Sequence, residues 1–200
     1  MKGYKAMSNE TEKELKVKEA VPDYNRLYTV EDYHSWDETF RAELYEGTLI
    51  VSETPTIKHQ KISVNLVVKI HAYLDGKPCQ VFHAPVGVRL SKNEESIFEP
   101  DIIIICDESK LDKRTCNGPP DMIIEILSPS TARMDKKLKF QKYQKSGVKE
   151  YWIVDPVHNL VEVNILKNDL YTTTIYAENE TAPISILEGL EIDLTEVFAE

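Results

Sequence analysis

The chain has 200 residues, 42% of them hydrophobic, and a formal net charge of −10. This length suits one globular domain, and the acidic balance argues against a protein that coats nucleic acid non-specifically. No apolar run approaches the roughly 20 residues of a membrane span, and the charged N-terminal stretch lacks the apolar core of a secretory signal. We therefore expect a cytoplasmic protein with no membrane partner.

The three cysteines, Cys79, Cys106 and Cys116, are odd in number and lack the CxxC spacing of zinc sites. This pattern predicts neither a disulfide framework nor a zinc site. Cys106 ends an apolar run and is expected to be a small core residue.

Residues 1–22 are charged and poor in large apolar side chains, which predicts a mobile arm ahead of a single domain over residues 23–200. A short helix over residues 28–40 follows, with Thr29 as its N-cap.

Residues 42–53 predict two extended segments joined by a turn at Glu46 and Gly47. Glu43 lies just before this turn. It is either a solvated strand residue, or an extra metal ligand or orienting residue at the rim of a functional site.

The clearest helix spans residues 56–74, because apolar side chains recur every fourth residue from Ile62 to Leu74. Thr56 is a suitable N-cap. His59 lies in the first turn, where it is either a capping or surface residue or a ligand.

Apolar runs predict strands over residues 80–90, bent at Pro85, and over residues 101–106 and 121–127. A helix over residues 133–146, ended by Gly147, and a strand over residues 149–156 follow in turn.

These elements predict an α+β protein with a mixed sheet and a core of about residues 56–156, in the order helix, three strands, helix, strand. Residues 160–189 predict short β segments, a hairpin extension that would suit a symmetric homodimer contact. The last residues predict a short closing helix.

Two carboxylates occupy places where buried strands do not favour them. Asp101 begins one apolar run and Glu125 lies inside the next. Alternation along adjacent strands allows both to face the same side at the same level. Together they can bind one Mg²⁺, or Mn²⁺ in its place, with the carbonyl of Ile126 as a further donor.

Lys139 lies on the inward arc of the helix that follows, four residues after Asp135. Either it forms an ion pair with Asp135 within the helix, or its ammonium orients water and stabilises charge on a reacting phosphate. Arg133, Lys136 and Lys142 on the same helix are either phosphate contacts or solvated residues.

These residues resemble the restriction-endonuclease-like PD-(D/E)XK superfamily, with Pro100-Asp101 as its PD and Glu125-Ile126-Leu127 as its (D/E)XK. The runs EILSPST (125–131) and GVKEYWIVDP (147–156) resemble the Uma-type family of bacterial endonucleases more closely, over roughly residues 26–198. The resemblance implies a restriction-endonuclease-like core with Mg²⁺ at the acidic pair. It also supports functional roles for Glu43 and for His59, which we expect to contact nucleic acid.

One position departs from the superfamily pattern, because Leu127 stands where the lysine is expected. Lys139 resembles the lysine that Uma-type relatives take from the following helix. The resemblance implies a Mg²⁺-dependent endonuclease that hydrolyses DNA through Asp101, Glu125, Lys139 and Glu43. The alternative is a catalytically silent module of the same fold that binds nucleic acid or protein.

Overall fold

The computed structural model describes residues 23, 25–36, 41–51, 54–128, 132 and 134–199. The predicted mobile arm at residues 1–22 lies outside this part of the chain. Six strands form the central sheet: β3 Gln80–His83, β5 Ile102–Ile105, β7 Met122–Ile126, β8 Glu150–Asp155, β9 Leu160–Lys167 and β10 Leu170–Ala177.

The central sheet has the strand order β10-β9-β8-β7-β5-β3. β7 and β8 are parallel, and the other neighbouring strands are antiparallel. A parallel pair requires a long crossover connection, and here a helical segment supplies it. The predicted mixed sheet and the predicted element order are therefore confirmed.

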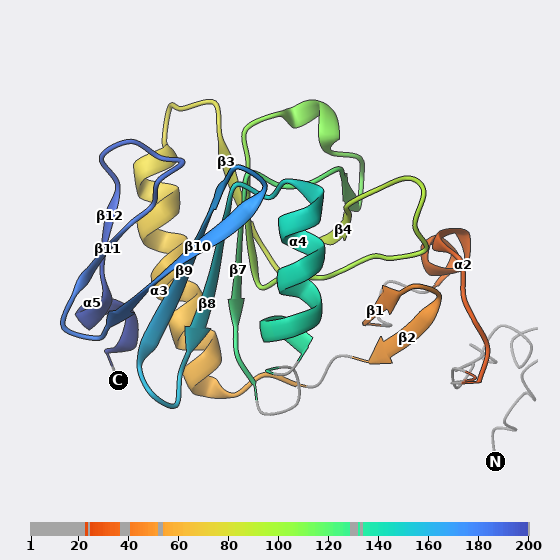
Figure 1. Ribbon diagram of the computed structural model, residues 1–200, viewed down its shortest axis with the longest axis horizontal. Coiled ribbons are helices and arrows are strands. Elements are labelled where there is room, and N and C mark those ends of the chain that lie inside the picture. The colour runs from red at the N-terminus through yellow and green to blue at the C-terminus, as the bar shows by residue number, and fades with distance from the viewer. Residues whose placement is uncertain are drawn as a thin grey trace, which may run out of the picture.

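The remaining elements surround this sheet (Figure 1). The helices are α2 Val30–Ser35, α3 Ile57–Leu74, the 3₁₀ turn η1 Glu108–Lys110, the π-helix η2 Met134–Lys139, α4 Phe140–Ser146 and α5 Leu194–Phe198. The short strands form three pairs, β1 Ala42–Tyr45 with β2 Thr48–Val51, β4 Gly87–Arg89 with β6 Thr115–Asn117, and β11 Thr181–Pro183 with β12 Glu191–Asp193. None of the described helices is both long enough and apolar enough to cross a membrane.

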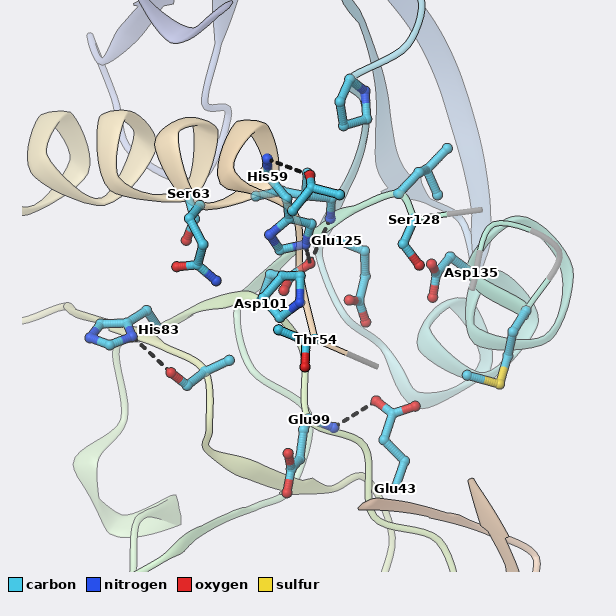
Figure 2. A pocket seen from close by; sticks show the side chains of 18 of the residues that line it. Glu43, Thr54, His59, Ser63, His83, Glu99, Asp101, Glu125, Ser128 and Asp135 are labelled. Carbon is cyan, nitrogen blue, oxygen red and sulfur yellow. Dashed lines mark hydrogen bonds and ion pairs between the residues drawn. The ribbon is translucent and has the colours of Figure 1, made fainter. Parts of the chain in front are cut away.

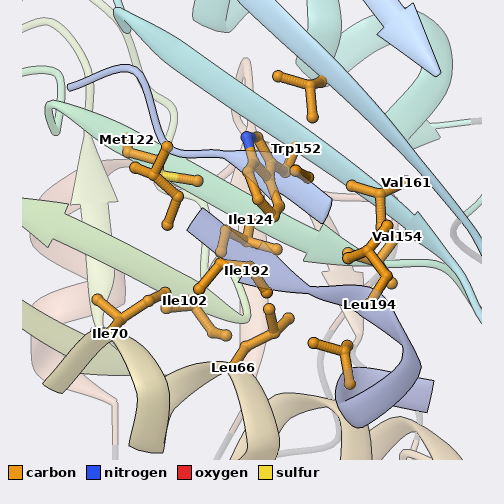
Figure 3. Close-up of a cluster of buried hydrophobic side chains, with 14 of the residues drawn as sticks. Leu66, Ile70, Ile102, Met122, Ile124, Trp152, Val154, Val161, Ile192 and Leu194 are labelled. Carbon is orange, nitrogen blue, oxygen red and sulfur yellow. The ribbon is translucent and has the colours of Figure 1, made fainter. Parts of the chain in front are cut away.

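The larger hydrophobic cluster lies between one face of the sheet and α3 with α5 (Figure 3). Leu66 and Ile70 of α3, which the four-residue periodicity predicts as inward, are fully buried against Ile102, Ile124 and their neighbours. α3 begins at its predicted N-cap, because the Thr56 side chain accepts a hydrogen bond from the backbone N–H of His59.

The second cluster fills the opposite face, under α4. Ile103 of β5, Ile123 of β7 and Ile153 of β8 point to this face because side chains alternate along each strand. Tyr143 of α4 is fully buried among them. The sheet is therefore covered on both sides, which explains why its central strands are apolar throughout.

Three predicted elements differ in detail from the structure. The helix predicted over residues 133–146 is a π-helix in its first half, at η2. The bend predicted at Pro85 separates two strands that belong to different sheets, β3 and β4. The predicted hairpin extension does not stand apart, since β9 and β10 continue the central sheet itself.

The expectation that the cysteines form no disulfide is wrong. Cys79 and Cys106 are joined by a disulfide, and Cys116 is free and buried. The antiparallel register of β3 and β5 pairs Gln80 with Ile105, so the next residues outward face each other. The spacing of 27 residues gives no sign of this proximity, which arises only when the strands pair.

We expect Leu66→Ala to lower the free energy of unfolding by about 2–5 kcal/mol, because it leaves a cavity in the cluster under α3. Val64→Ala, two residues earlier on the same helix, is the control, since Val64 is 57% exposed. Urea denaturation monitored by circular dichroism measures both changes. Equal destabilisation by the two variants would contradict the packing described for α3.

Candidate active site

A cleft of about 370 Å³ opens where β5 begins and β7 ends (Figure 2). Its walls come from the β1–β2 hairpin, the first turns of α3, the end of β3 and η2. Glu43, Asp101, Glu125, Asp135 and Lys139 all line it. The cleft therefore gathers acidic side chains from four separate parts of the chain, together with Lys139.

The pairing of β5 with β7 brings the two predicted carboxylates to the same end of the sheet. Ile102 lies opposite Ile124, so one further step along both strands places Asp101 opposite Glu125. Glu125 is 4% exposed, on the face that packs against α4. The same alternation that buries Ile123 and Ile153 thus carries this carboxylate to the cleft.

Asp101 is held by two hydrogen-bonding groups. Its Oδ2 accepts the backbone N–H of Ile126 at 2.8 Å and lies 3.2 Å from Nε2 of His59. Burial acts to lower the pKa of His59, but the bond to Asp101 and the charge of that carboxylate outweigh burial and raise it. In this structure the buried ring fixes the Asp101 carboxylate. The predicted contact of His59 with nucleic acid and the metal-ligand role of the Ile126 carbonyl stay predictions.

Lys139 is the centre of a buried ionic cluster. Its Nζ lies 2.9 Å from Oε1 of Glu43 and 2.9 Å from Oε1 of Glu125. It also lies 3.3 Å from Oδ1 of Asp135. The ion pair with Asp135 is therefore present, and the same ammonium also reaches the two glutamates. The action of Lys139 on water or phosphate stays a prediction.

The charges in this cluster do not balance, since three buried carboxylates face one ammonium. Burial acts to lower the pKa of Lys139, but the carboxylates around it raise it well above its usual value. Burial raises the pKa of Glu125 well above its usual value; Lys139 opposes this rise, and the nearby carboxylates add to it. An excess of negative charge at the floor of a cleft favours a cation.

The π-helix η2 supplies Lys139 and Asp135. π-helical turns are rare and occur frequently at functional sites. Both residues are buried in η2, whereas its other lysines, Lys136 and Lys137, are not buried. The wider turn changes the angular position of each side chain relative to an α-helix, a shift that the apolar periodicity of the sequence does not reveal.

The sequence did not identify the groups that hydrogen-bond to the carboxylates of this site. The hydroxyl of Tyr143 donates a hydrogen bond to Oε1 of Glu125 at 2.9 Å, so Oε1 has partners on two sides. The backbone N–H of Glu99 donates to Oε1 of Glu43 at 2.8 Å. Periodicity marks Tyr143 as inward, but nothing in the sequence shows which carboxylate it reaches.

The predicted nucleic-acid contacts on η2 and α4 are occupied by intramolecular ion pairs. Lys136 Nζ lies 2.5 Å from Oε1 of Glu162. Lys142 Nζ lies 2.9 Å from Glu94 and 3.1 Å from Glu46. Arg133 lies outside the described residues. The charges of Lys136 and Lys142 are thus partly neutralised by carboxylates of the same chain.

The donor set matches a hard cation. Mg²⁺ in proteins retains several waters and is commonly bound through one or two carboxylates together with substrate phosphates. Asp101 and Glu125 provide two carboxylates from paired positions. The described part of the chain contains no group of three histidine, cysteine, aspartate or glutamate side chains arranged around one ion, so an all-protein cage is not formed there.

The solved structures include a close match in fold. A crystal structure of a "putative nuclease belonging to DUF820" from Anabaena variabilis superposes with a TM-score of 0.69, covering 85% of this chain and 97% of that one at 22% identity. This similarity, with the mixed sheet described above, shows that the chain has the α+β fold of that protein. The predicted fold class is thereby confirmed.

Residues 30–195 match the model of the Uma2 family, described as "Putative restriction endonuclease", and the chain belongs to that family. Two uncharacterized proteins of Synechocystis are similar in sequence. One, slr1290, is 27% identical over 143 residues, covering 70% of this chain and 74% of its own length. The other, sll1609, is 25% identical over 135 residues, covering 65% and 76%.

We expect Lys139→Ala to destabilise the fold by about 3–5 kcal/mol near neutral pH, because it leaves buried carboxylates without a counter-charge. Burial and the nearby carboxylates raise the pKa of Glu125 above its usual value, and without the ammonium, Lys139 no longer opposes this rise. Protonation of Glu125 therefore stabilises the fold at low pH, and this contribution is lost as the pH rises.

The destabilisation should accordingly be smaller at about pH 5 than at about pH 8, as measured by urea denaturation. Lys145→Ala is the control, because Lys145 is an exposed lysine of the adjoining α4. A loss of unfolding free energy that is independent of pH, or equal for the two variants, would contradict the charge balance of this cluster.

Proposed function

We propose that this protein is a Mg²⁺-dependent endonuclease that hydrolyses phosphodiester bonds of DNA. The observation that supports this most strongly is the buried cluster in which Lys139 contacts Glu43 and Glu125 at the floor of the cleft. Membership of a family described as restriction endonucleases agrees with it. We further propose that the enzyme works in the cytoplasm, on DNA.

Each residue of the cleft would have a distinct role in the reaction. Asp101, fixed by His59 and Ile126, and Glu125, fixed by Lys139 and Tyr143, would hold the cation. Bound there, Mg²⁺ would polarise the phosphoryl oxygen and favour attack by water.

Lys139 would donate a hydrogen bond to the attacking water or to a phosphate oxygen, where it stabilises the negative charge that develops. Glu43 shares the ammonium with Glu125, so it would keep Lys139 protonated and aimed into the cleft. Preorganised donors of this kind need no reorganisation when the reaction occurs. Leu127 at the usual lysine position is then compatible with catalysis, because Lys139 reaches Glu125 from η2.

A specific observation also favours the alternative, a catalytically silent binding module. Lys139 already serves as the cation for the carboxylates, and no group of three metal-ligating side chains is found among the described residues. The two functions differ in whether the folded protein binds a divalent cation.

We expect Mg²⁺ at about 100 times its dissociation constant to raise the free energy of unfolding by about 2.7 kcal/mol, because it binds only the folded state. Thermal melting with and without Mg²⁺ measures this. Asp101→Asn and Glu125→Gln should abolish both the rise in Tm and the cleavage of a plasmid substrate. Glu191→Gln, an exposed carboxylate of β12, should change neither.

If Mg²⁺ and Mn²⁺ leave the melting temperature of the native protein unchanged, the silent module is the correct function. If both cleft variants cut DNA as fast as the native protein, the assignment of Asp101 and Glu125 is wrong.

The raised pKa of Glu125 predicts a pH dependence of metal binding. Protons compete with the cation for this carboxylate, so Mg²⁺ affinity should increase as the pH rises through the raised pKa. Mg²⁺ titrations followed by melting temperature between about pH 5 and about pH 8 would measure it. An affinity that is constant over this range would show that Glu125 is fully ionised at its lower end.

A further inference from the structure

The start of α3 brings positive charge to the cleft. α3 is an 18-residue helix with no acidic residue in its first turn. Thr56, Lys58 and His59 from this end line the cleft. The N-terminal end of a helix carries a partial positive charge and free backbone N–H groups, which favour phosphate. The cleft therefore has an acidic floor and, beside it, a wall of opposite sign.

Lys58 adds a full charge to this wall. Its Nζ donates a hydrogen bond to the side-chain oxygen of Asn159 at 2.9 Å, which is a neutral partner. Lys136 and Lys142, by contrast, face carboxylates. An amide positions the ammonium without neutralising it, so Lys58 keeps its attraction for an anion.

His59 provides a separate indication that a ligand belongs here. The residue is 7% exposed and lines the cleft, and its Nδ1 has no hydrogen-bond partner among the described residues. Buried polar atoms are nearly always paired, so an unpaired one in a residue that lines a cleft indicates a group that arrives from outside. Figure 2 shows the ring between the first turn of α3 and Asp101.

We propose that the first turn of α3, with Lys58, binds a backbone phosphate adjacent to the one that is cleaved. The proposal rests on the proposed function and adds the path of the nucleic acid strand. The strand would cross from the acidic floor, where the scissile phosphate would lie at the cation held by Asp101 and Glu125, onto the start of α3. Phosphate contacts of this kind fix the register of a strand without reading its sequence.

Lys61 offers a matched control for a test. It lies one turn after Lys58 on the same helix and is exposed, but it does not line the cleft. Lys58→Gln and Lys61→Gln therefore remove the same charge from the same helix. Lys58→Arg keeps the charge at the proposed site.

The experiment measures binding of a fluorescein-labelled DNA duplex by anisotropy, over a series of salt concentrations, in EDTA so that no cleavage occurs. Each lost phosphate contact reduces the salt slope by about 0.9. We expect Lys58→Gln to weaken DNA binding and to reduce the salt slope by about 0.9, the value for one phosphate contact. Lys61→Gln should leave the slope unchanged, and Lys58→Arg should restore it. Melting temperatures of all variants verify that they are folded.

The proposal is overturned if the Lys58→Gln and Lys61→Gln variants behave alike, or if the native protein does not bind the duplex. Plasmid cleavage with Mg²⁺, measured in parallel, separates this result from the fate of the proposed function. If the Lys58→Gln variant cleaves the plasmid at the native rate and with native affinity, only the proposed phosphate subsite is ruled out. If the salt slope falls only in Lys58→Gln and the native protein does not cleave DNA, the result supports the phosphate subsite. The same result rules out the proposed catalytic function.

Discussion

Charge compensation by Lys139 is the interaction on which the candidate site depends. Buried carboxylates are tolerated only when they are paired and hydrogen-bonded, and this ammonium contacts three of them. Three buried carboxylates against one ammonium leave an excess of acidic groups at the floor of the cleft. One side chain thus permits the whole acidic cluster to be buried.

The hydrophobic core and the site are built from the same strands. Ile103 and Ile123 fix the face that packs under α4, and Glu125 follows in the same alternation. A slip of one residue in the pairing of β5 and β7 would turn Glu125 away from Lys139. The apolar core therefore determines the geometry of the ionic cluster, and the parallel pair of β7 and β8 places η2 above it.

Much of the fold was predictable because its signals are local. The four-residue stripe of α3, the Thr56 cap and the apolar runs of β5 and β7 each depend on a few neighbouring residues. The π-helical start of the crossover helix was not predictable, because a π-turn and an α-turn share the same apolar pattern. The disulfide between Cys79 and Cys106 was missed because it requires strand register rather than sequence spacing.

The sequence by itself determined the order of elements and the chemical groups available: carboxylates at Asp101 and Glu125, and an inward lysine at Lys139. Only the tertiary structure decided that Glu43 joins them, that His59 holds Asp101, and that Lys136 and Lys142 are paired within the chain. The reason is physical. Periodicity specifies the face on which a side chain lies, but the partner of a charged group depends on segments far apart in the chain meeting at one end of the sheet.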